Sequence, residues 1–317
     1  MTERRSAVRR AVLHPHRPRG IREELQQLEE QGAIELVVAE DADEVAAELA
    51  AGAQILVTFR WEERFLQPSL RWVASISAGV DQYPVADFER AGVTLTTASG
   101  VNAIAVAEHA MALLLGCVRR LDAAIVSQTH RRWERHGPRL ELHGSTMVVA
   151  GIGAIGERVA ELATGFGMRV IGVKRRPEDY RGCAQRVVGP DELVAVCREA
   201  DVLVNALPGG EQTRDLISTD ALGALAGGWF VSVGRGSVVD EPALLAALDA
   251  GILRGAGLDV FAEEPLDQAS PLWTMPGVLL TAHYGGLSPD YGRRWVELFR
   301  RNLAADASRE AWTNRVI

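Results

Sequence analysis

Short apolar runs alternate along the first part of the chain with longer segments in which apolar residues recur every three or four positions. The short runs lie at residues 11–13, 34–38, 54–58 and 72–76. The longer periodic segments lie between them, at residues 21–32 and 43–51. Because a buried strand is short and apolar whereas a helix repeats about every 3.6 residues, this alternation predicts strands joined by helices. Such units form a doubly wound parallel sheet.

The same alternation resumes in the second half of the chain. Further apolar runs, each followed by a turn, lie at residues 147–150, 169–173, 201–208, 229–233, 257–261 and 278–281. Residues 101–121 separate the two halves and are apolar on nearly all sides, which predicts one long helix buried between two domains. We therefore expect an α/β protein with two doubly wound, Rossmann-like parallel sheets.

The length and composition agree with two ordinary globular domains. At 317 residues the chain exceeds the ~100–200 residues typical of one domain. Hydrophobic residues make up 47% and charged residues 24%, and no run of about 18 apolar residues could span a membrane. The net charge of −8 argues against a nucleic acid or an anionic membrane as partner, because both require a basic surface.

Arginines are concentrated near the N-terminus, at Arg4, Arg5, Arg9, Arg10, Arg17 and Arg19. This segment lacks the long apolar region of a secretory signal and passes through the strand-like run 11–13. We therefore interpret it as a solvent-exposed edge of the first domain.

The three cysteines are Cys117, Cys183 and Cys197, an odd number at wide spacing. This arrangement fits neither a disulfide framework nor a zinc site. We expect no bound metal, and the reducing cytoplasm as the compartment.

A glycine-rich turn follows the apolar run 147–150. Gly151, Gly153 and Gly156 form the spacing Gly-x-Gly-x-x-Gly, and Ala154 and Ile155 open a helical pattern. The first glycine permits the turn, the second lets backbone approach a pyrophosphate, and the third lets the helix pack close to the strand. The helix N-terminus offers N–H groups to the anion. The spacing alone is a weak signal among 31 glycines, but its strand-to-helix setting predicts a dinucleotide site.

The residues after the next strand, 169–173, bear on which dinucleotide binds. An acidic side chain there would bond the adenosine ribose 2′-hydroxyl and repel a 2′-phosphate. This chain instead has Lys174, Arg175 and Arg176. Three cations and no acid favour NADP(H), with NAD(H) as the alternative. The segment could equally be a solvated basic loop that Glu178 and Asp179 neutralise.

Three later strands each end near a group capable of acid–base or anion chemistry: Arg235, Glu264 and His283. Each alone has an ordinary structural explanation, as a surface turn, a solvated loop or a satisfied histidine. Together they predict an active site, because the carboxyl ends of parallel strands share one edge of a sheet and ligands bind there.

These segments resemble the D-isomer-specific 2-hydroxyacid dehydrogenase family over nearly the whole chain, and most closely its glyoxylate and hydroxypyruvate reductases. The matching segments are residues 77–81 (Ser-Ala-Gly-Val-Asp), 106–109 (Val-Ala-Glu-His), 151–156, 207–208 with Thr213, 234–236 (Gly-Arg-Gly), 239–241 (Val-Asp-Glu), 258–261 (Leu-Asp-Val-Phe), 264–266 (Glu-Pro-Leu) and His283. The chain departs from the family at Ala282, where proline is usual, and at Gly234, where alanine or threonine is commoner.

The resemblance implies that His283 is the general acid, Glu264 its partner and Arg235 the cation that binds the substrate carboxylate. Imidazole gains and loses a proton near neutral pH, and a neighbouring carboxylate favours its charged form. The guanidinium fork of arginine matches a carboxylate better than lysine does. Reduction of a 2-keto acid requires a hydride donor, a proton donor to the developing alkoxide, and a cation that binds the carboxylate and polarises the carbonyl. His283 and Arg235 would supply the second and the third.

The resemblance assigns further residues to substrate and cofactor. The backbone N–H groups of Ala78 and Gly79 would bind the substrate carboxylate, and Asp259 would bond the nicotinamide carboxamide. The other residues implied at the cofactor are Val106 and Gly234 by the nicotinamide, Leu207 and Pro208 by the adenosine, and Thr213 and Gly285. Apart from the resemblance, Arg60 and Trp61 follow the run 54–58 in the first domain and could face the substrate, where a cation would suit a polar or charged substrate tail.

Several of these residues also have a simpler interpretation. Asp259 could be a strand-end turn residue, Val106 and Leu207 could be plain core residues, and Arg60, which we slightly favour as a surface residue, follows the run 54–58. Trp133 and Trp273 are open to the same alternative.

We expect a dinucleotide-binding domain at residues 101–284, inserted into a substrate domain of residues 1–100 and 285–317 that includes a C-terminal helix near 290–307. The predicted reaction is NADPH-dependent reduction of a small 2-keto acid to the D-2-hydroxy acid, with domain closure excluding water. The resemblance also implies a homodimer to which residues 101–121 contribute. The alternative is an NAD(P)-sensing binding protein like the C-terminal-binding-protein corepressors, whose usual additional tails this chain has little length to hold.

Overall fold

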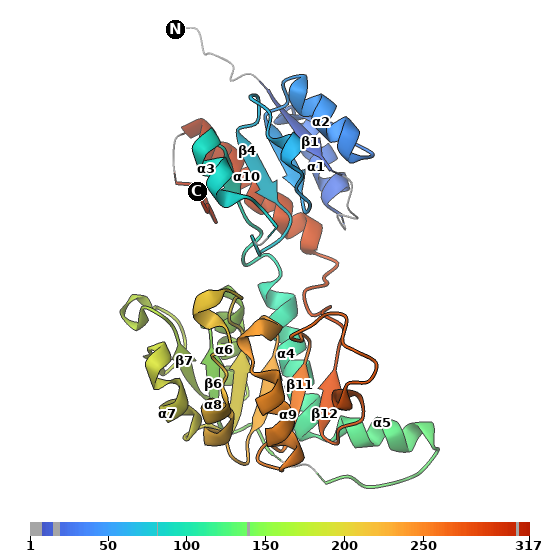
Figure 1. Cartoon of the computed structure of the whole chain (residues 1–317), viewed down its shortest axis with the longest axis vertical. Coiled ribbons are helices and arrows are strands. Elements are labelled where there is room, and N and C mark those ends of the chain that lie inside the picture. Colours follow the sequence, from blue (N-terminus) through green and yellow to red (C-terminus); the bar gives the residue numbers. More distant parts are fainter. Residues whose placement is uncertain (1–7, 15–19, 81, 138–139, 309–310) are drawn as a thin grey trace. The chain divides into compact units, whose positions relative to one another are not determined.

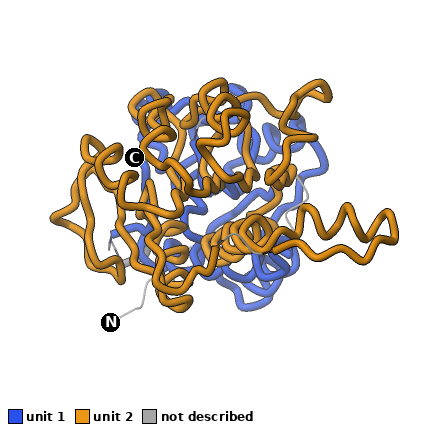
Figure 2. Tube along the Cα trace, turned by 90° about the horizontal axis from the view of Figure 1, so that it is seen from below, with its two compact units in different colours: residues 1–102, 288–317 blue, residues 103–287 orange. Residues whose placement is uncertain are grey.

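The computed structural model describes residues 1–317 except 1–7, 15–19, 81, 138–139 and 309–310. Arg4, Arg5, Arg17, Arg19 and Asp81 therefore lie outside the described residues. The chain forms two compact units, one of Met1–Asn102 with Ser288–Ile317 and the other of Ala103–Leu287 (Figures 1 and 2). No helix among the described residues is long and apolar enough to cross a membrane.

Unit 1 contains a five-stranded parallel sheet in the order β2-β1-β3-β4-β5. Its strands are β1 (Arg9–Leu13), β2 (Ile34–Val38), β3 (Ile55–Thr58), β4 (Trp72–Ser75) and β5 (Thr94–Thr96). Its helices are α1 (Ile21–Glu30), α2 (Ala42–Ala50), α3 (Val85–Ala91) and α10 (Tyr291–Ser308). The C-terminal segment returns to the sheet edge, where Val316 donates its N–H to the Leu95 carbonyl.

Alternation along the strands gives unit 1 a core on each face of its sheet. In β1, Leu13 packs with residues of α1 and α10 such as Leu25 and Phe299. Its neighbour Val12 points to the opposite face, with residues of α2 and α3 such as Val45. Because successive strand residues face opposite sides, one short apolar run serves both layers.

The arginines of β1 do not form a solvated edge, so that interpretation is wrong for Arg9 and Arg10. β1 lies between β2 and β3, and both side chains are partly buried. Arg9 forms an ion pair with Asp306, and Arg10 with Glu48 at 2.6 Å and with Glu35 at 3.3 Å. The partners lie far away in sequence, so local sequence gave no sign of them.

Unit 2 contains a seven-stranded parallel sheet in the order β12-β11-β10-β9-β6-β7-β8. Its strands are β6 (Thr146–Ala150), β7 (Arg169–Val173), β8 (Arg186–Val188), β9 (Val202–Asn205), β10 (Trp229–Ser232), β11 (Gly255–Leu258) and β12 (Val278–Leu280). Its helices are α4 (Ala103–Val118), α5 (Leu121–Thr129), α6 (Ala154–Gly165), α7 (Leu193–Cys197), α8 (Thr219–Ala224) and α9 (Glu241–Asp249). The two parallel sheets confirm the predicted α/β class.

The sheet of unit 2 reverses its direction of growth beside β6. The chain runs from β6 to β7 and β8 on one side, then crosses to β9 and continues to β12 on the other. The carboxyl ends of β6 and β9 therefore border a topological switch point, the usual ligand site of open parallel sheets. The glycine turn lies directly after β6.

The predicted helix at residues 101–121 is shorter than expected and ends at a sharp turn. α4 stops at Val118, Arg120 adopts a left-handed backbone (φ 63°), and α5 starts at Leu121. The buried side of α4 packs against α6 and against β10, β11 and β12 within unit 2. The apolar side chains of α4 are thus explained by their packing in the core of unit 2.

Candidate active site

The glycine turn after β6 has the geometry of a phosphate cradle. Gly151 has φ 94°, and a Cβ atom there would lie 2.8 Å from the Leu207 backbone nitrogen. A Cβ on Gly156 would collide with the Gly151 carbonyl, so only glycine lets α6 pack this close. A Cβ on Gly153 would meet nothing within 4 Å. The middle glycine therefore faces open space at the start of α6, where backbone can approach a pyrophosphate.

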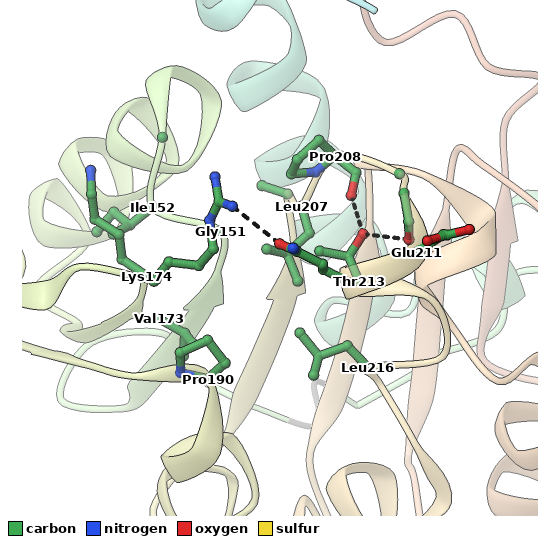
Figure 3. Close-up of a pocket in the computed structure, with 16 residues that line it drawn as sticks. Gly151, Ile152, Val173, Lys174, Pro190, Leu207, Pro208, Glu211, Thr213 and Leu216 are labelled. Carbon is green, nitrogen blue, oxygen red and sulfur yellow. Dashed lines mark hydrogen bonds between the residues drawn. The ribbon is translucent and has the colours of Figure 1, made fainter. Parts of the chain in front are cut away.

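A cavity of about 620 Å³ lies at the switch point beside this turn (Figure 3). Seven of the residues expected at the cofactor line it: Gly151, Gly153, Lys174, Arg175, Leu207, Pro208 and Thr213. The figure shows Lys174 on one side and Thr213 on the other. Thr213 donates its hydroxyl to the Pro208 carbonyl at 2.8 Å, which fixes the loop between them. The cavity has the size and polar rim of a small-molecule site.

Other residues of this cavity escaped the sequence analysis. Ile152, Val173, Pro190, Gln212 and Leu216 also line it. Ile152 lies within the glycine motif and Val173 ends a predicted strand, so their positions could have been inferred. Pro190, Gln212 and Leu216 come from loops whose folding no local pattern reveals.

The remaining residues expected around the turn have different positions. Ala154 lines a second opening of about 650 Å³ together with Gly153 and Lys174. Ile155 packs against the core of unit 2. Val106, in α4, is buried in that same core, as its simpler interpretation predicts.

The three cations after β7 differ in their partners. Arg176 forms an ion pair with Asp179 at 3.1 Å between Nε and Oδ2. Arg175 donates to the Gln212 side-chain oxygen at 3.2 Å. Lys174 and Arg175 form no ion pair with any residue that the structure describes. Neutralisation of the segment by neighbouring acids is therefore partial: Lys174 and Arg175 border the cavity without an ion pair, and the cavity lining also includes one acid, Glu211.

His283 and Glu264 form a hydrogen-bonded pair. The distance from His283 Nδ1 to Glu264 Oε2 is 2.7 Å, and Glu264 Oε1 accepts the Phe261 N–H at 3.1 Å. The carboxylate is thus oriented by backbone on one side and by imidazole on the other. Because a carboxylate only accepts, Nδ1 is the protonated donor, and Nε2 points away from this bond as the group able to transfer a proton.

The loop that carries His283 is attached to Asp259. His283 has a left-handed backbone (φ 49°), which is unfavourable for a residue with a side chain. Its N–H donates to the Asp259 carbonyl at 2.9 Å, and the Tyr284 and Gly285 N–H groups donate to the Asp259 carboxylate at 3.1 and 3.0 Å. These bonds stabilise the strained conformation and so set the direction of the imidazole.

Two side chains support Asp259. Thr281 donates to Oδ1 at 2.6 Å, and His109 lies 2.8 Å from the Thr281 hydroxyl and 3.4 Å from Oδ1. Burial alone would raise the pKa of Asp259, but hydrogen bonds from His109, Thr281 and Gly285 outweigh burial and leave that pKa below its ordinary value. The carboxylate therefore stays ionised at neutral pH and keeps accepting these bonds. Thr281 was missed because its role depends on partners far along the chain.

Arg235 follows β10, the neighbour of β11, at the same carboxyl edge. Its side chain is partly buried, and Nη1 donates to the Gly234 carbonyl at 3.0 Å. Asn205 donates to the Arg235 carbonyl at 3.3 Å, which ties this turn to β9. A Cβ on Gly234 would collide with the Leu207 carbonyl, so the glycine at this position follows from close packing of the two loops.

A cavity of about 650 Å³ lies beside the His283–Glu264 pair. Apart from these two residues its lining is mainly apolar and comprises Phe261, Pro265, Leu266, Trp273, Leu280, Thr281, Ala282 and Tyr284. The pair therefore borders a largely nonpolar space, but 45% of the His283 side chain and 35% of the Glu264 side chain are exposed, so water partly screens their interaction.

Unit 1 contains the other expected substrate residues, in loops after two adjacent strands. Ala78 and Gly79 follow β4, and the Gly79 N–H donates to the Ser77 hydroxyl at 3.2 Å. Arg60 follows β3 and is exposed, as its simpler interpretation predicts. Trp61 belongs instead to the core, with its ring centroid 4.4 Å from that of Phe88. Within the described residues, no group of three or more His, Cys, Asp or Glu side chains could hold a metal ion.

Comparison with known proteins gives consistent matches. A sequence model of the NAD-binding domain of D-isomer-specific 2-hydroxyacid dehydrogenases matches residues 111–285. The chain is 36% identical to a glyoxylate reductase of Thermococcus kodakarensis over 253 residues, 75% of this chain and 74% of that protein. It is 32% identical to glyoxylate/hydroxypyruvate reductase B of Serratia proteamaculans over 306 residues, 93% of each.

Solved structures show the same likeness. An NADPH-dependent glyoxylate/hydroxypyruvate reductase from Sinorhizobium meliloti, in complex with NADP and malonate, matches 98% of this chain and 97% of its own, with a TM-score of 0.77 and 30% identity. A D-isomer-specific 2-hydroxyacid dehydrogenase family protein from Aeromonas salmonicida matches 98% and 99%, with a TM-score of 0.83 and 28% identity.

Proposed function

The chain belongs to the D-isomer-specific 2-hydroxyacid dehydrogenase family, and from this premise we propose that it reduces a small 2-keto acid, of the glyoxylate or hydroxypyruvate type, to the D-2-hydroxy acid with NADPH. The observation that carries the proposal is the 2.7 Å bond between His283 Nδ1 and Glu264, which leaves Nε2 available to carry the transferable proton when the ring is an imidazolium. The glycine cradle and the cavity beside it fit a dinucleotide, which supplies the hydride when bound.

The residues of this chain account for the other half of the reaction. Arg235 binds the substrate carboxylate through its planar fork and polarises the carbonyl. The bound cofactor would supply the hydride to C2; as the C=O π bond breaks, His283 Nε2 gives its proton to the carbonyl oxygen, so the new hydroxyl group is uncharged while the carboxylate of the product is unchanged. Glu264 keeps the imidazole oriented and stabilises its charged form before transfer.

Further roles follow from the family resemblance. We assign the backbone N–H groups of Ala78 and Gly79 to the substrate carboxylate, and Asp259 and Gly234 to the nicotinamide end of the cofactor. Asp259 already accepts bonds from Thr281, Tyr284 and Gly285, so a carboxamide would take one remaining lone pair. Arg60 stays a proposed contact for a polar substrate tail.

The test is turnover. NADPH oxidation, followed by its absorbance, should be measured with glyoxylate, hydroxypyruvate and larger 2-keto acids. Turnover with at least one of the small acids is expected. Tight binding of NADPH without turnover on any 2-keto acid would overturn the proposal and support the corepressor-like alternative, which the reductase relatives do not favour.

The preference for NADP(H) over NAD(H) is proposed from Lys174, Arg175 and Arg176. Replacing all three by alanine should weaken NADPH binding by about 10- to 100-fold, because each charge-assisted bond to a phosphate contributes on the order of 1.5–3 kcal/mol before solvent screening. NADH binding should change less than about threefold, since NADH lacks the 2′-phosphate. Dissociation constants from nucleotide fluorescence measure both. Equal affinities of the wild type for NADPH and NADH would refute the assignment.

A homodimer is proposed because unit 2 exposes an apolar arm, defined here as α5 and residues 130–137. Leu121, Ile125, Val126 and Trp133 are 48%, 55%, 57% and 96% exposed. Figures 1 and 2 show α5 extending away from the rest of unit 2. Clustered exposed apolar side chains mark interaction sites, and a second copy of this chain presents a surface of the same kind, as a two-fold interface requires.

Light scattering tests the dimer. The wild type should have twice the mass of one chain, and Ile125→Asp with Val126→Asp should reduce it to one, because two buried carboxylates would oppose association. Ile252→Asp, which places one carboxylate on a side chain that is 39% exposed and lies outside the arm, is the control and should remain dimeric. A monomeric wild type would refute the proposal.

We also propose the cytoplasm as the compartment of this protein. Its three cysteines are free thiols, which fits a reducing environment.

A further inference from the structure

Glu157, the residue directly after the glycine motif, connects α6 to the loop of residues 174–183. Its Oε2 accepts the Tyr180 hydroxyl at 2.7 Å, and its Oε1 accepts the Cys183 N–H at 2.9 Å. The Tyr180 oxygen in turn accepts the Ala184 N–H at 2.9 Å. A Cβ on Gly182 would collide with both the carboxylate and the phenol oxygen, so the loop passes directly over Glu157.

This loop carries the cations proposed to bind a 2′-phosphate. At its start, the Lys174 N–H donates to the Val188 carbonyl at 3.0 Å. In its middle, Arg176 pairs with Asp179 across a short 3₁₀ turn at Pro177–Asp179. At its end the Glu157 bonds attach it to the first turn of α6. The Cys183 side chain also hydrogen-bonds to Thr164 further along α6, and Tyr180 and Cys183 pack against the core of unit 2. Both ends are therefore fixed, and at the second end the Glu157 carboxylate accepts two of the bonds that hold the loop.

The same contacts explain why an acid can lie so near an anion site. Glu157 stands in the first turn of α6, where the helix dipole stabilises negative charge. Burial raises the pKa of the Tyr180 phenol to about 12, and the nearby carboxylate acts in the same direction. The phenol therefore stays a neutral donor at physiological pH, and the carboxylate is engaged by two donors on its loop side.

We infer that Glu157 is a positioning residue that keeps the loop 174–183 folded on α6 and thereby favours ligands with a 2′-phosphate. A loop released from α6 would have to be ordered when the phosphate binds, and that loss of conformational entropy would weaken the complex. A ligand without the phosphate makes no use of Arg175 and Arg176 and would lose little. The inference rests on the proposed NADP(H) preference and adds Glu157 as the residue that maintains this preference by holding the loop in place.

Calorimetry with nicotinamide-free ligands tests the inference without turnover. The ratio of the dissociation constants of ADP-ribose and 2′-phospho-ADP-ribose should be measured for the wild type and for Tyr180→Phe. Removing one hydroxyl should reduce this ratio about 5- to 10-fold, with ADP-ribose itself changed less than about twofold. Gly182→Ala, which displaces the same contact from the loop side, should reduce the ratio in the same direction.

Tyr291→Phe is the matched control, because it also removes one phenol oxygen, which donates to the Ile76 carbonyl at 2.7 Å in unit 1. Its ratio should equal that of the wild type. A wild-type ratio near one would refute the cofactor proposal itself. A high wild-type ratio that stays unchanged in folded Tyr180→Phe and Gly182→Ala proteins would overturn the inference alone.

Discussion

Replacing His283 by alanine is expected to lower kcat for reduction of a 2-keto acid by about 10²- to 10⁴-fold, the usual contribution of a positioned general acid. The product alkoxide would have to take its proton from water, while the cradle at Gly151–Gly156 is untouched. The dissociation constant of NADPH should therefore stay within about twofold of the wild type, as measured by nucleotide fluorescence. Steady-state rates and binding together separate loss of the acid from loss of the cofactor.

Glu264→Gln supplies the matched comparison. Glutamine has a single acceptor oxygen, so it can still accept the Nδ1–H bond of His283, but its NH2 group then faces the Phe261 N–H and cannot accept from it. The imidazole therefore keeps its hydrogen-bond partner and loses the electrostatic support of a charged carboxylate. An intermediate loss of about tenfold in kcat is expected. If His283→Ala retained kcat within tenfold of the wild type, His283 would not be the acid and the assigned mechanism would be wrong.

The arrangement of strands explains how the reacting groups come together in unit 2. β10, β11 and β12 are adjacent in the sheet and parallel, so the loops that follow them emerge at one edge. These loops carry Arg235, Glu264 and His283, and β6 places the glycine turn at the same edge. α9 connects β10 to β11, and a loop with a short 3₁₀ turn connects β11 to β12, which is why residues far apart in sequence serve one site.

The strands and the glycine turn could be predicted because their causes are local. A strand buried on both faces is an apolar run, and β6, β7, β9 and β10 each appear as one. The turn at Gly151 requires a backbone that only glycine adopts easily. The carboxyl ends of such strands then indicate where chemistry occurs, and this reasoning led to the pair that the structure shows at 2.7 Å.

Prediction from the sequence failed where an element was too short, or its local pattern too uninformative, to reveal it. β5 and β8 have three residues each, too few to show a period, and both lie at sheet edges. The break between α4 and α5 was missed because the apolar pattern continues through it to Leu121. Asp259 was recognised from the family, but its attachment of the His283 loop depends on Thr281 and on His109, which lies 172 positions before Thr281.

Replacing Arg235 by alanine is expected to lower kcat/KM for a 2-keto acid by about 10²- to 10³-fold, because truncating one partner of a desolvated charge pair costs on the order of 2–5 kcal/mol. Arg235→Lys should recover only part of the loss, since an ammonium lacks the two parallel donors that match a carboxylate. Both variants should bind NADPH as the wild type does, because Arg235 follows β10 and lies outside the lining of the cavity beside the glycine turn.

The decisive comparison pairs each protein with glyoxylate and with glyoxylamide, which has the same reacting carbonyl but no carboxylate. If Arg235 binds that carboxylate, the alanine variant should lose most of its rate on glyoxylate and at most about threefold on glyoxylamide. The difference between the two losses is a coupling free energy, which isolates the pair from general effects of the substitution. Equal losses on both substrates would show that Arg235 supports the turn between β10 and its neighbours and does not recognise the carboxylate.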